Sequence, residues 1–142
     1  MNTQEAFDKS MKALVGQAFG SINSELDCRY RLGLRTRGTC ACAIGHLIPD
    51  EMYREDMEGD SPTGLMKYPD IKSLFSRVDA LALRHMQSAH DRAAFWVQKR
   101  TPNVEFLENL RFGVLHGELP SMVSTREFEK LVNERIQELK SS

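Results

Sequence analysis

The stretch CACAIGHLIPDEMY, residues 40–53, decides the fold of this chain. It holds two thiols, an imidazole, a glycine and a helix-stopping proline, and MEG follows it at residues 57–59. The apolar residues at 44, 47 and 48 have helical spacing, so the stretch predicts a short buried helix over 41–48 that ends before Pro49. A strongly basic run precedes the stretch and a strongly acidic run follows it. This density of special residues marks the centre of the fold.

Length and composition are those of one ordinary globular domain. The 142 residues fit a single domain over 1–142, which is large enough to fold without a disulfide or a metal. The balance of 19 basic and 20 acidic residues argues against a general nucleic-acid or membrane-surface binder. We expect neither a membrane-spanning segment nor a secretory signal, because the sequence shows no apolar run of the required length. The number of cysteines is odd, three, which favours free thiols over a set of disulfides. We therefore expect a cytoplasmic protein with neither a membrane nor a nucleic acid as partner.

Apolar periodicity places most of the chain in helices. Thr3 and Asp70 are the expected caps of two of them, and a capping box over 124–127 begins the last. On the helix over 70–90, Leu81 and His85 fall on the apolar stripe and are predicted to be buried. The predicted helices cover residues 4–19, 41–48, 70–90, 95–97, 102–116 and the span from 124 to about 139.

The segment that precedes the central stretch has a different pattern. Residues 28–40 contain two short runs with a period of two around glycines, which predict a small β-hairpin. We therefore expect a mainly α fold, a single compact helical domain with a small β-hairpin near residues 28–40. A long connection over 50–70 follows, and connections of that length are often functional.

The basic run places two pairs of arginines on the predicted hairpin. Residues two apart in an extended chain share a face, so four guanidinium groups would gather over a small area. Arginine forks bind phosphates and carboxylates bidentately, and nearby glycines leave room for a ligand to approach. The hairpin is therefore a candidate site for an anionic small molecule. The candidate ligand-binding residues are Arg29, Tyr30, Arg31, Arg35, Arg37, His46 and Tyr53.

The acidic run offers a second interpretation of the same arginines. Six carboxylates lie between Asp50 and Asp60, close in sequence to the arginines and opposite in charge. Surface charge clusters usually do nothing more specific than pair, so pairing between the two runs is the simpler interpretation. The acidic run does not fit a calcium loop, because Lys67 stands where the closing glutamate would be. Ligand binding and intramolecular pairing both remain open for the arginines.

The thiols and imidazoles fit no metal or nucleophile pattern. A structural zinc site commonly takes its ligands in pairs spaced by two to four residues, whereas one residue separates Cys40 from Cys42. Cys42 and His46 would share a helix face, but no third group is evident to orient them. We therefore expect no metal, no cofactor and no catalytic residue, and we interpret the cysteines as small buried hydrophobes.

A distinctive motif, C-A-I-G-x-L-I-P-D-E-x-Y, spans residues 42–53 and is followed by M-E-G. A Cys-x-Tyr-Arg run at 28–31 precedes it, and a Met-Gln-x-x-His-Asp run at 86–91 comes after it. Together these motifs resemble those of a family of small uncharacterised bacteriophage and prophage proteins, over roughly residues 4–97. The resemblance implies a small accessory protein that acts in the cytoplasm of a bacterial host during infection. It carries over no catalytic role.

Functions of three classes follow from these patterns. The first is binding without catalysis, in which the protein sequesters an anionic small ligand such as a signalling nucleotide, or inhibits a host protein, for example in counter-defence. The second is a small hydrolase or metal-dependent enzyme that uses Cys42, His46 or the acidic loop. The third is a helical oligomeric regulatory protein whose last helix pairs with a partner. Small phage accessory proteins often act by binding, and this association favours the first class.

Overall fold

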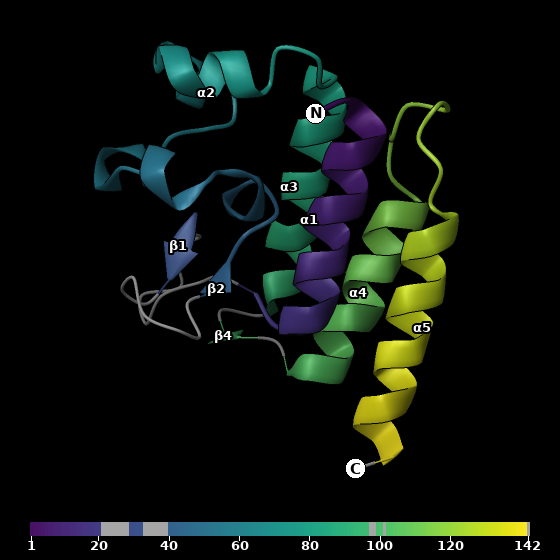
Figure 1. Cartoon of the computed structure of the whole chain (residues 1–142). Helices are drawn as coiled ribbons and strands as arrows, with labels where there is room; N and C mark the ends of the chain where they lie inside the picture. Colours follow the sequence, from purple (N-terminus) through teal and green to yellow (C-terminus); the bar gives the residue numbers. More distant parts are fainter. Residues whose placement is uncertain (21–28, 33–39, 97–98, 101, 142) are drawn as a thin grey trace.

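A computed structural model describes residues 1–20, 29–32, 40–96, 99–100 and 102–141 of the chain. These residues are mainly helical, as the sequence predicts. Figure 1 shows α1, α3, α4 and α5 side by side, with α2 and the segment that precedes it lying beside α1 and α3. In chain order the elements are α1 (Thr3–Gln17), β1 (Arg31–Leu32), β2 (Cys40–Ala41), η1 (Gly45–Leu47), η2 (Asp50–Met52), η3 (Glu55–Met57), η4 (Gly64–Lys67), α2 (Pro69–Leu74), α3 (Ala80–Ala94), β3 (Phe95–Trp96), β4 (Lys99–Arg100), α4 (Asn103–Leu115) and α5 (Arg126–Ser141), where η denotes a 3₁₀ turn.

The four long helices share one apolar core. α3 packs most extensively on α4, and α5 packs on both α1 and α4. Phe7 of α1 meets Phe128 of α5 edge to face, with 5.9 Å between the ring centroids, and Phe106 of α4 is buried with them. Burial of each large apolar side chain contributes roughly 1.5–3 kcal/mol, so these rings are a main source of the packing energy.

The segment 41–48 inserts into this core, but it is not a helix. Ser10 Oγ donates to the Ala43 carbonyl at 2.7 Å, and the Ile44 N–H donates to Gln87 Oε1 at 3.1 Å. An α-helix would use these two backbone groups for its own ladder. The predicted helix over 41–48 is therefore wrong, because side chains of α1 and α3 take its hydrogen bonds and leave only the short turn η1.

α1 begins one residue earlier than the expected cap suggests. Asn2 Oδ1 accepts from the Glu5 N–H at 2.9 Å, and Glu5 Oε1 accepts from the Asn2 N–H at 3.0 Å, which completes a capping box. Thr3, the predicted cap, lies in the first turn, and its Oγ1 accepts from the Asp79 N–H at 2.9 Å. The start of α1 is thus tied to the residue that precedes α3.

The single helix predicted over 70–90 is two helices, α2 and α3. Asp79 ends the connection between them and caps α3, because its Oδ1 accepts from the Ala82 N–H at 2.9 Å. The interruption changes the helical phase. Leu81, predicted to be buried, is therefore 57% exposed, and His85 is part-exposed rather than buried in the core.

Two further predictions, both for the second half of the chain, differ from the structure. The sequence predicts a helix over 95–97, but Phe95 and Trp96 form β3, which pairs antiparallel with β4. Residue 97 lies outside the described residues. The last helix begins at Arg126, one residue later than a cap at Ser124 predicts. There Gln4 Nε2 donates to the Ser124 carbonyl at 2.9 Å, and the Ser124 N–H donates to Gln4 Oε1 at 2.7 Å, so α1 holds Ser124 outside α5.

The structure describes the predicted hairpin only in part. β1 and β2 pair antiparallel, with Arg31 opposite Ala41 and Leu32 opposite Cys40. Residues 33–39, where the turn was expected, lie outside the described residues, as does residue 28. The connection over 50–70 is built from the turns η2, η3 and η4 before α2 begins.

Substitution of two glycines tests how closely the segment 41–48 packs against Tyr30. A Cβ at Gly45 would overlap the Tyr30 carbonyl oxygen, whereas a Cβ at Gly16 in α1 would meet nothing within 4 Å. We expect Gly45→Ala to lower the free energy of unfolding by about 2 kcal/mol or more, measured by urea denaturation. Gly16→Ala is the matched control and should raise it by about 0.5–1 kcal/mol, because alanine favours the helix. Equal stabilities of the two variants would contradict this packing.

Candidate functional site

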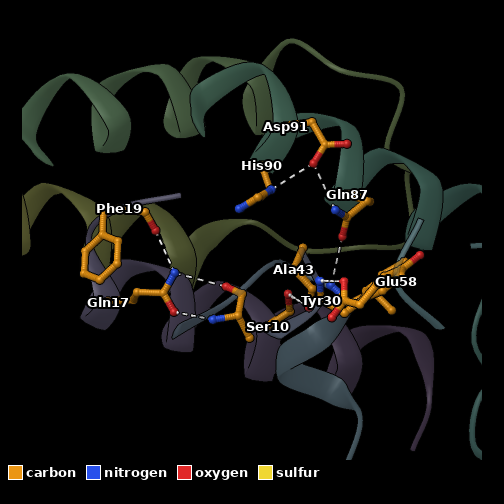
Figure 2. A network of polar contacts seen from close by, with 11 residues as sticks. Ser10, Gln17, Phe19, Tyr30, Ala43, Glu58, Gln87, His90 and Asp91 are labelled. Atoms are coloured by element: carbon orange, nitrogen blue, oxygen red, sulfur yellow. Dashed lines mark hydrogen bonds and ion pairs between the residues drawn. The ribbon is translucent and has the colours of Figure 1, made fainter. Parts of the chain in front are cut away.

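One largely buried carboxylate organises the residues at the end of the basic run. Glu58 Oε1 accepts from the Tyr30 N–H at 2.8 Å, and Oε2 accepts from the Tyr53 hydroxyl at 2.6 Å. Arg29 Nε lies 3.6 Å from Oε1, and the Glu58 side chain is only 9% exposed. Such burial costs a carboxylate much of its hydration, and these donors replace it. Figure 2 shows Tyr30 and Glu58 beside one another.

The residues on either side of Glu58 explain why it points inward. Met57 ends η3 and is fully buried, which brings the chain onto the core. Gly59 has φ of 86°, a left-handed conformation that glycine adopts without a steric penalty. The Tyr30 hydroxyl then donates to the Asp60 carbonyl just beyond this glycine. The M-E-G motif is therefore a tight turn that Tyr30 holds from two sides.

In the part of the chain that the structure describes, Arg29 meets Glu58 through one nitrogen. Its Nε is 3.6 Å from Glu58 Oε1, beyond ordinary hydrogen-bond distance, and its side chain is 33% exposed. Among the residues that the structure describes, no hydrogen bond or ion pair involves Nη1 or Nη2 of Arg29. The outer edge of the guanidinium group therefore keeps two N–H donors for a bidentate partner.

Arg54, in the acidic segment, has the opposite arrangement. Its Nη1 and Nη2 donate to the two carboxylate oxygens of Asp70 at 3.3 and 2.9 Å. This contact is the main cause that lowers the pKa of Asp70 and raises the pKa of Arg54. Lys67 also has a carboxylate partner, since its Nζ lies 3.2 Å from Asp60 Oδ2. These two cations are thus occupied by the acidic segment and by α2.

Tyr53 is the second side chain that Glu58 fixes. Burial of the phenol raises the pKa of Tyr53 above the ordinary value of 10.0, and the hydrogen bond to Glu58 raises it further. The neighbouring guanidinium of Arg29 lowers this pKa, but its effect is smaller. Tyr53 therefore stays a neutral hydrogen-bond donor throughout the physiological range.

His46 belongs to a different cluster, centred on Gln17 at the end of α1. Gln17 Nε2 donates to the Ala41 carbonyl at 3.0 Å and to the Phe19 carbonyl at 2.7 Å, while Oε1 accepts from the Ala41 N–H at 2.9 Å (Figure 2). Because these bonds fix Oε1 as an acceptor, His46 Nε2, which lies 2.9 Å away, must donate to it. His46 thus ties η1 to the end of α1, while Gln17 holds β2 there.

A third polar group links segment 41–48 to α3. Gln87, whose Oε1 accepts from Ile44, donates through Nε2 to Asp91 Oδ1 at 2.9 Å. His90 Nδ1 is also 2.9 Å from that oxygen (Figure 2). The His90 ring is fully buried and packs against Phe106 in a T-shaped arrangement. Since a carboxylate only accepts, His90 carries a proton on Nδ1. The pair orders the core around α3.

The described residues that bear on the enzyme alternative are Cys42 and the possible metal ligands. Cys42 is fully buried, as expected for a small hydrophobe. Within the described ranges, no three His, Cys, Asp or Glu side chains gather where they could hold a metal ion. The side chain of Cys40 and the whole of Cys28 lie outside what the structure describes.

The seven predicted site residues thus separate into groups. Arg29, Tyr30 and Tyr53 come together around Glu58, and His46 lies in the Gln17 cluster. The side chain of Arg31 and the whole of Arg35 and Arg37 fall outside the described residues. The pairing interpretation holds for Arg29, but only through Nε. Sequence analysis missed the role of Gln17, because a glutamine in an amphipathic helix carries no signal of a distant backbone partner.

Comparison of the chain with protein-family models, with curated proteins and with solved structures finds no match. None of the helices in the described part of the chain is long and apolar enough to cross a membrane. The assignment of a function therefore depends on the geometry around Glu58.

The environment of Tyr53 predicts an unusual alkaline titration. In the folded protein Tyr53 should form phenolate only well above the ordinary pKa of 10.0, so its contribution to stability is complete below that pH and is lost as the pH rises through the raised pKa. The measurement is the ultraviolet phenolate absorbance of the native protein minus that of Tyr53→Phe. A difference curve with its midpoint at the ordinary pKa would contradict the buried hydrogen bond to Glu58.

Truncation of Glu58 tests how much the carboxylate contributes to the fold. We expect Glu58→Ala to lower the free energy of unfolding by about 2 kcal/mol or more, because the Tyr30 N–H and the Tyr53 hydroxyl both lose their acceptor. Glu55→Ala removes an exposed acid of the same segment and should change stability by less than about 0.5 kcal/mol. Urea denaturation of both variants gives the comparison, and similar losses would argue against an organising role for Glu58.

Proposed function

We propose that the protein acts by binding an anionic small molecule at Arg29, without catalysis. The observation that carries this proposal is the state of the Arg29 guanidinium group. Glu58 orients it through Nε, and in the described residues its Nη1 and Nη2 atoms have no partner. A phosphate or carboxylate group matches the spacing of these two donors.

The surroundings of Arg29 favour binding because they fix it in advance. Glu58 is itself held by the Tyr30 N–H and by the Tyr53 hydroxyl, so the carboxylate that orients Arg29 cannot rotate freely. A side chain that is already ordered loses less conformational entropy when a ligand binds. Arg54 is also ordered, but its Nη1 and Nη2 atoms already donate to Asp70 and are not available to a ligand.

The proposal extends to the other arginines of the basic run. Arg31 follows two residues after Arg29, and a hairpin formed by β1, β2 and the residues between them would bring Arg35 and Arg37 onto the same element. Several guanidinium groups select ligands with more than one negative charge, such as nucleotides. The resemblance to small phage proteins suggests the setting, in which sequestration of a host signalling nucleotide would serve counter-defence.

Isothermal titration calorimetry with inorganic pyrophosphate, a nucleoside monophosphate and a cyclic dinucleotide tests this function. We expect at least one probe to bind, and Arg29→Ala to weaken that binding by about ten- to a hundredfold, the equivalent of one charge-assisted hydrogen bond or more. Arg54→Ala is the matched control, because it removes a nearby arginine whose donors are already occupied. Its affinity should equal that of the unmodified protein.

Two results would overturn the proposal. The first is equal loss of affinity in both arginine variants, which would indicate a general charge effect rather than a site at Arg29. The second is the absence of binding to every probe, together with native mass spectra of protein from bacterial cells that show no bound small molecule. Inhibition of a host protein would then be the hypothesis to test, by pull-down from host lysate.

A further inference from the structure

The outward face of α4 carries a stripe of exposed side chains that its role in the core does not explain. Glu105, Asn109, Phe112 and His116 follow one another at intervals of four, three and four residues. All four are exposed, and Phe112 is 66% exposed despite its large apolar ring. Such spacing places them along one side of a helix and is the spacing of a coiled-coil seam.

The neighbours of α4 leave this stripe uncovered. Arg111 donates to Asn133 Oδ1 on α5 at 2.7 Å, and a Cβ at Gly113 would lie 3.5 Å from Ala89 Cβ on α3. α5 and α3 therefore lie on the two sides of the helix next to Phe112. The apolar stripe of α5, by contrast, is already used inside the molecule, since Phe128, Val132 and Ile136 are buried.

Phe112 and His116 form an ordered pair on this surface. Their rings stack with 4.2 Å between centroids and an interplanar angle of 22°. His116 Nδ1 lies 3.1 Å from the Phe112 carbonyl and donates to it, so the opposite nitrogen, Nε2, is the one left for an outside partner. The pair presents a flat apolar surface beside an ionisable group.

The order of the four residues makes the stripe complementary to itself. In an antiparallel pair of helices related by a two-fold axis between positions 109 and 112, Phe112 lies against Asn109 of the second copy. The same axis places His116 opposite Glu105 of the second copy, and symmetry repeats both contacts. An imidazole faces a carboxylate at each end, with the two phenylalanine rings adjacent at the centre.

We propose that this face of α4 binds a second copy of the chain in an antiparallel, two-fold pairing. The phenylalanine rings supply the apolar contact, and the two histidine–glutamate pairs set the register and the orientation. Leu115, which is 38% exposed, lies on the same helix and adds apolar surface. Because most of the stripe is polar, the association is weak and concentration-dependent.

Sedimentation equilibrium from micromolar to millimolar protein tests the pairing. We expect a reversible monomer–dimer equilibrium whose dissociation constant rises at least tenfold in Phe112→Asp. Met122→Asp is the matched control, because Met122 is 68% exposed but lies outside α4, and its dissociation constant should be unchanged. A monomer at every concentration, or equal effects of the two substitutions, would overturn the proposal.

A charge exchange tests the register independently of the apolar contact. Glu105→Lys alone and His116→Glu alone each place like charges opposite one another, so each should weaken the dimer. The double substitution Glu105→Lys/His116→Glu restores opposite charges and should recover the dissociation constant of the unmodified protein to within about threefold. Failure of the double variant to recover, with circular dichroism showing all variants folded, would overturn the antiparallel register.

Discussion

The structure depends on how the backbone of segment 41–48 is hydrogen-bonded inside the core. Apart from β2 and the short turn η1, this segment has no regular structure, so side chains of other elements satisfy several of its peptide groups. Gln17 pairs with both the N–H and the carbonyl of Ala41, Ser10 donates to Ala43, and Gln87 accepts from Ile44. Each buried peptide group left without a partner would cost about 1–3 kcal/mol. Side chains of α1 and α3 thus hydrogen-bond to this irregular segment as the backbone of a neighbouring strand would. Gln4 does the same for Ser124, because its side chain bonds to both the N–H and the carbonyl of that residue.

This mode of support explains which parts of the fold the sequence predicts. α1, α4 and α5 follow from local apolar periodicity, which needs no knowledge of distant residues. Segment 41–48 has helical spacing too, but its conformation is set by Gln87, which lies 43 residues beyond Ile44. The break between α2 and α3 likewise depends on Thr3, which is 76 residues from its partner Asp79. Periodicity cannot report such contacts, because they arise only when the helices have packed.

The candidate site was predictable to a similar extent and for related reasons. Charge alone indicates that the basic and acidic runs interact, and the contact between Arg29 and Glu58 agrees with that. The charge pattern does not indicate which of the acidic side chains points toward the core. Met57 and Gly59 supply that information, because a buried side chain and a left-handed glycine on either side direct Glu58 toward the core. If M-E-G is interpreted as a turn, it predicts that Glu58 is the acid that faces the core.

In the proposed function, Glu58 serves stability and also orients the residue that binds the ligand. Its short hydrogen bonds go to Tyr30 and Tyr53, and the longer contact of 3.6 Å goes to Arg29. Because the tyrosine groups take the best positions around the carboxylate, Arg29 is oriented without being fully neutralised. Arg54 differs, since both ends of its fork meet Asp70 directly. Within the described residues, an arginine held in the first way has two donors without a partner, and the proposed recognition of an anion depends on them.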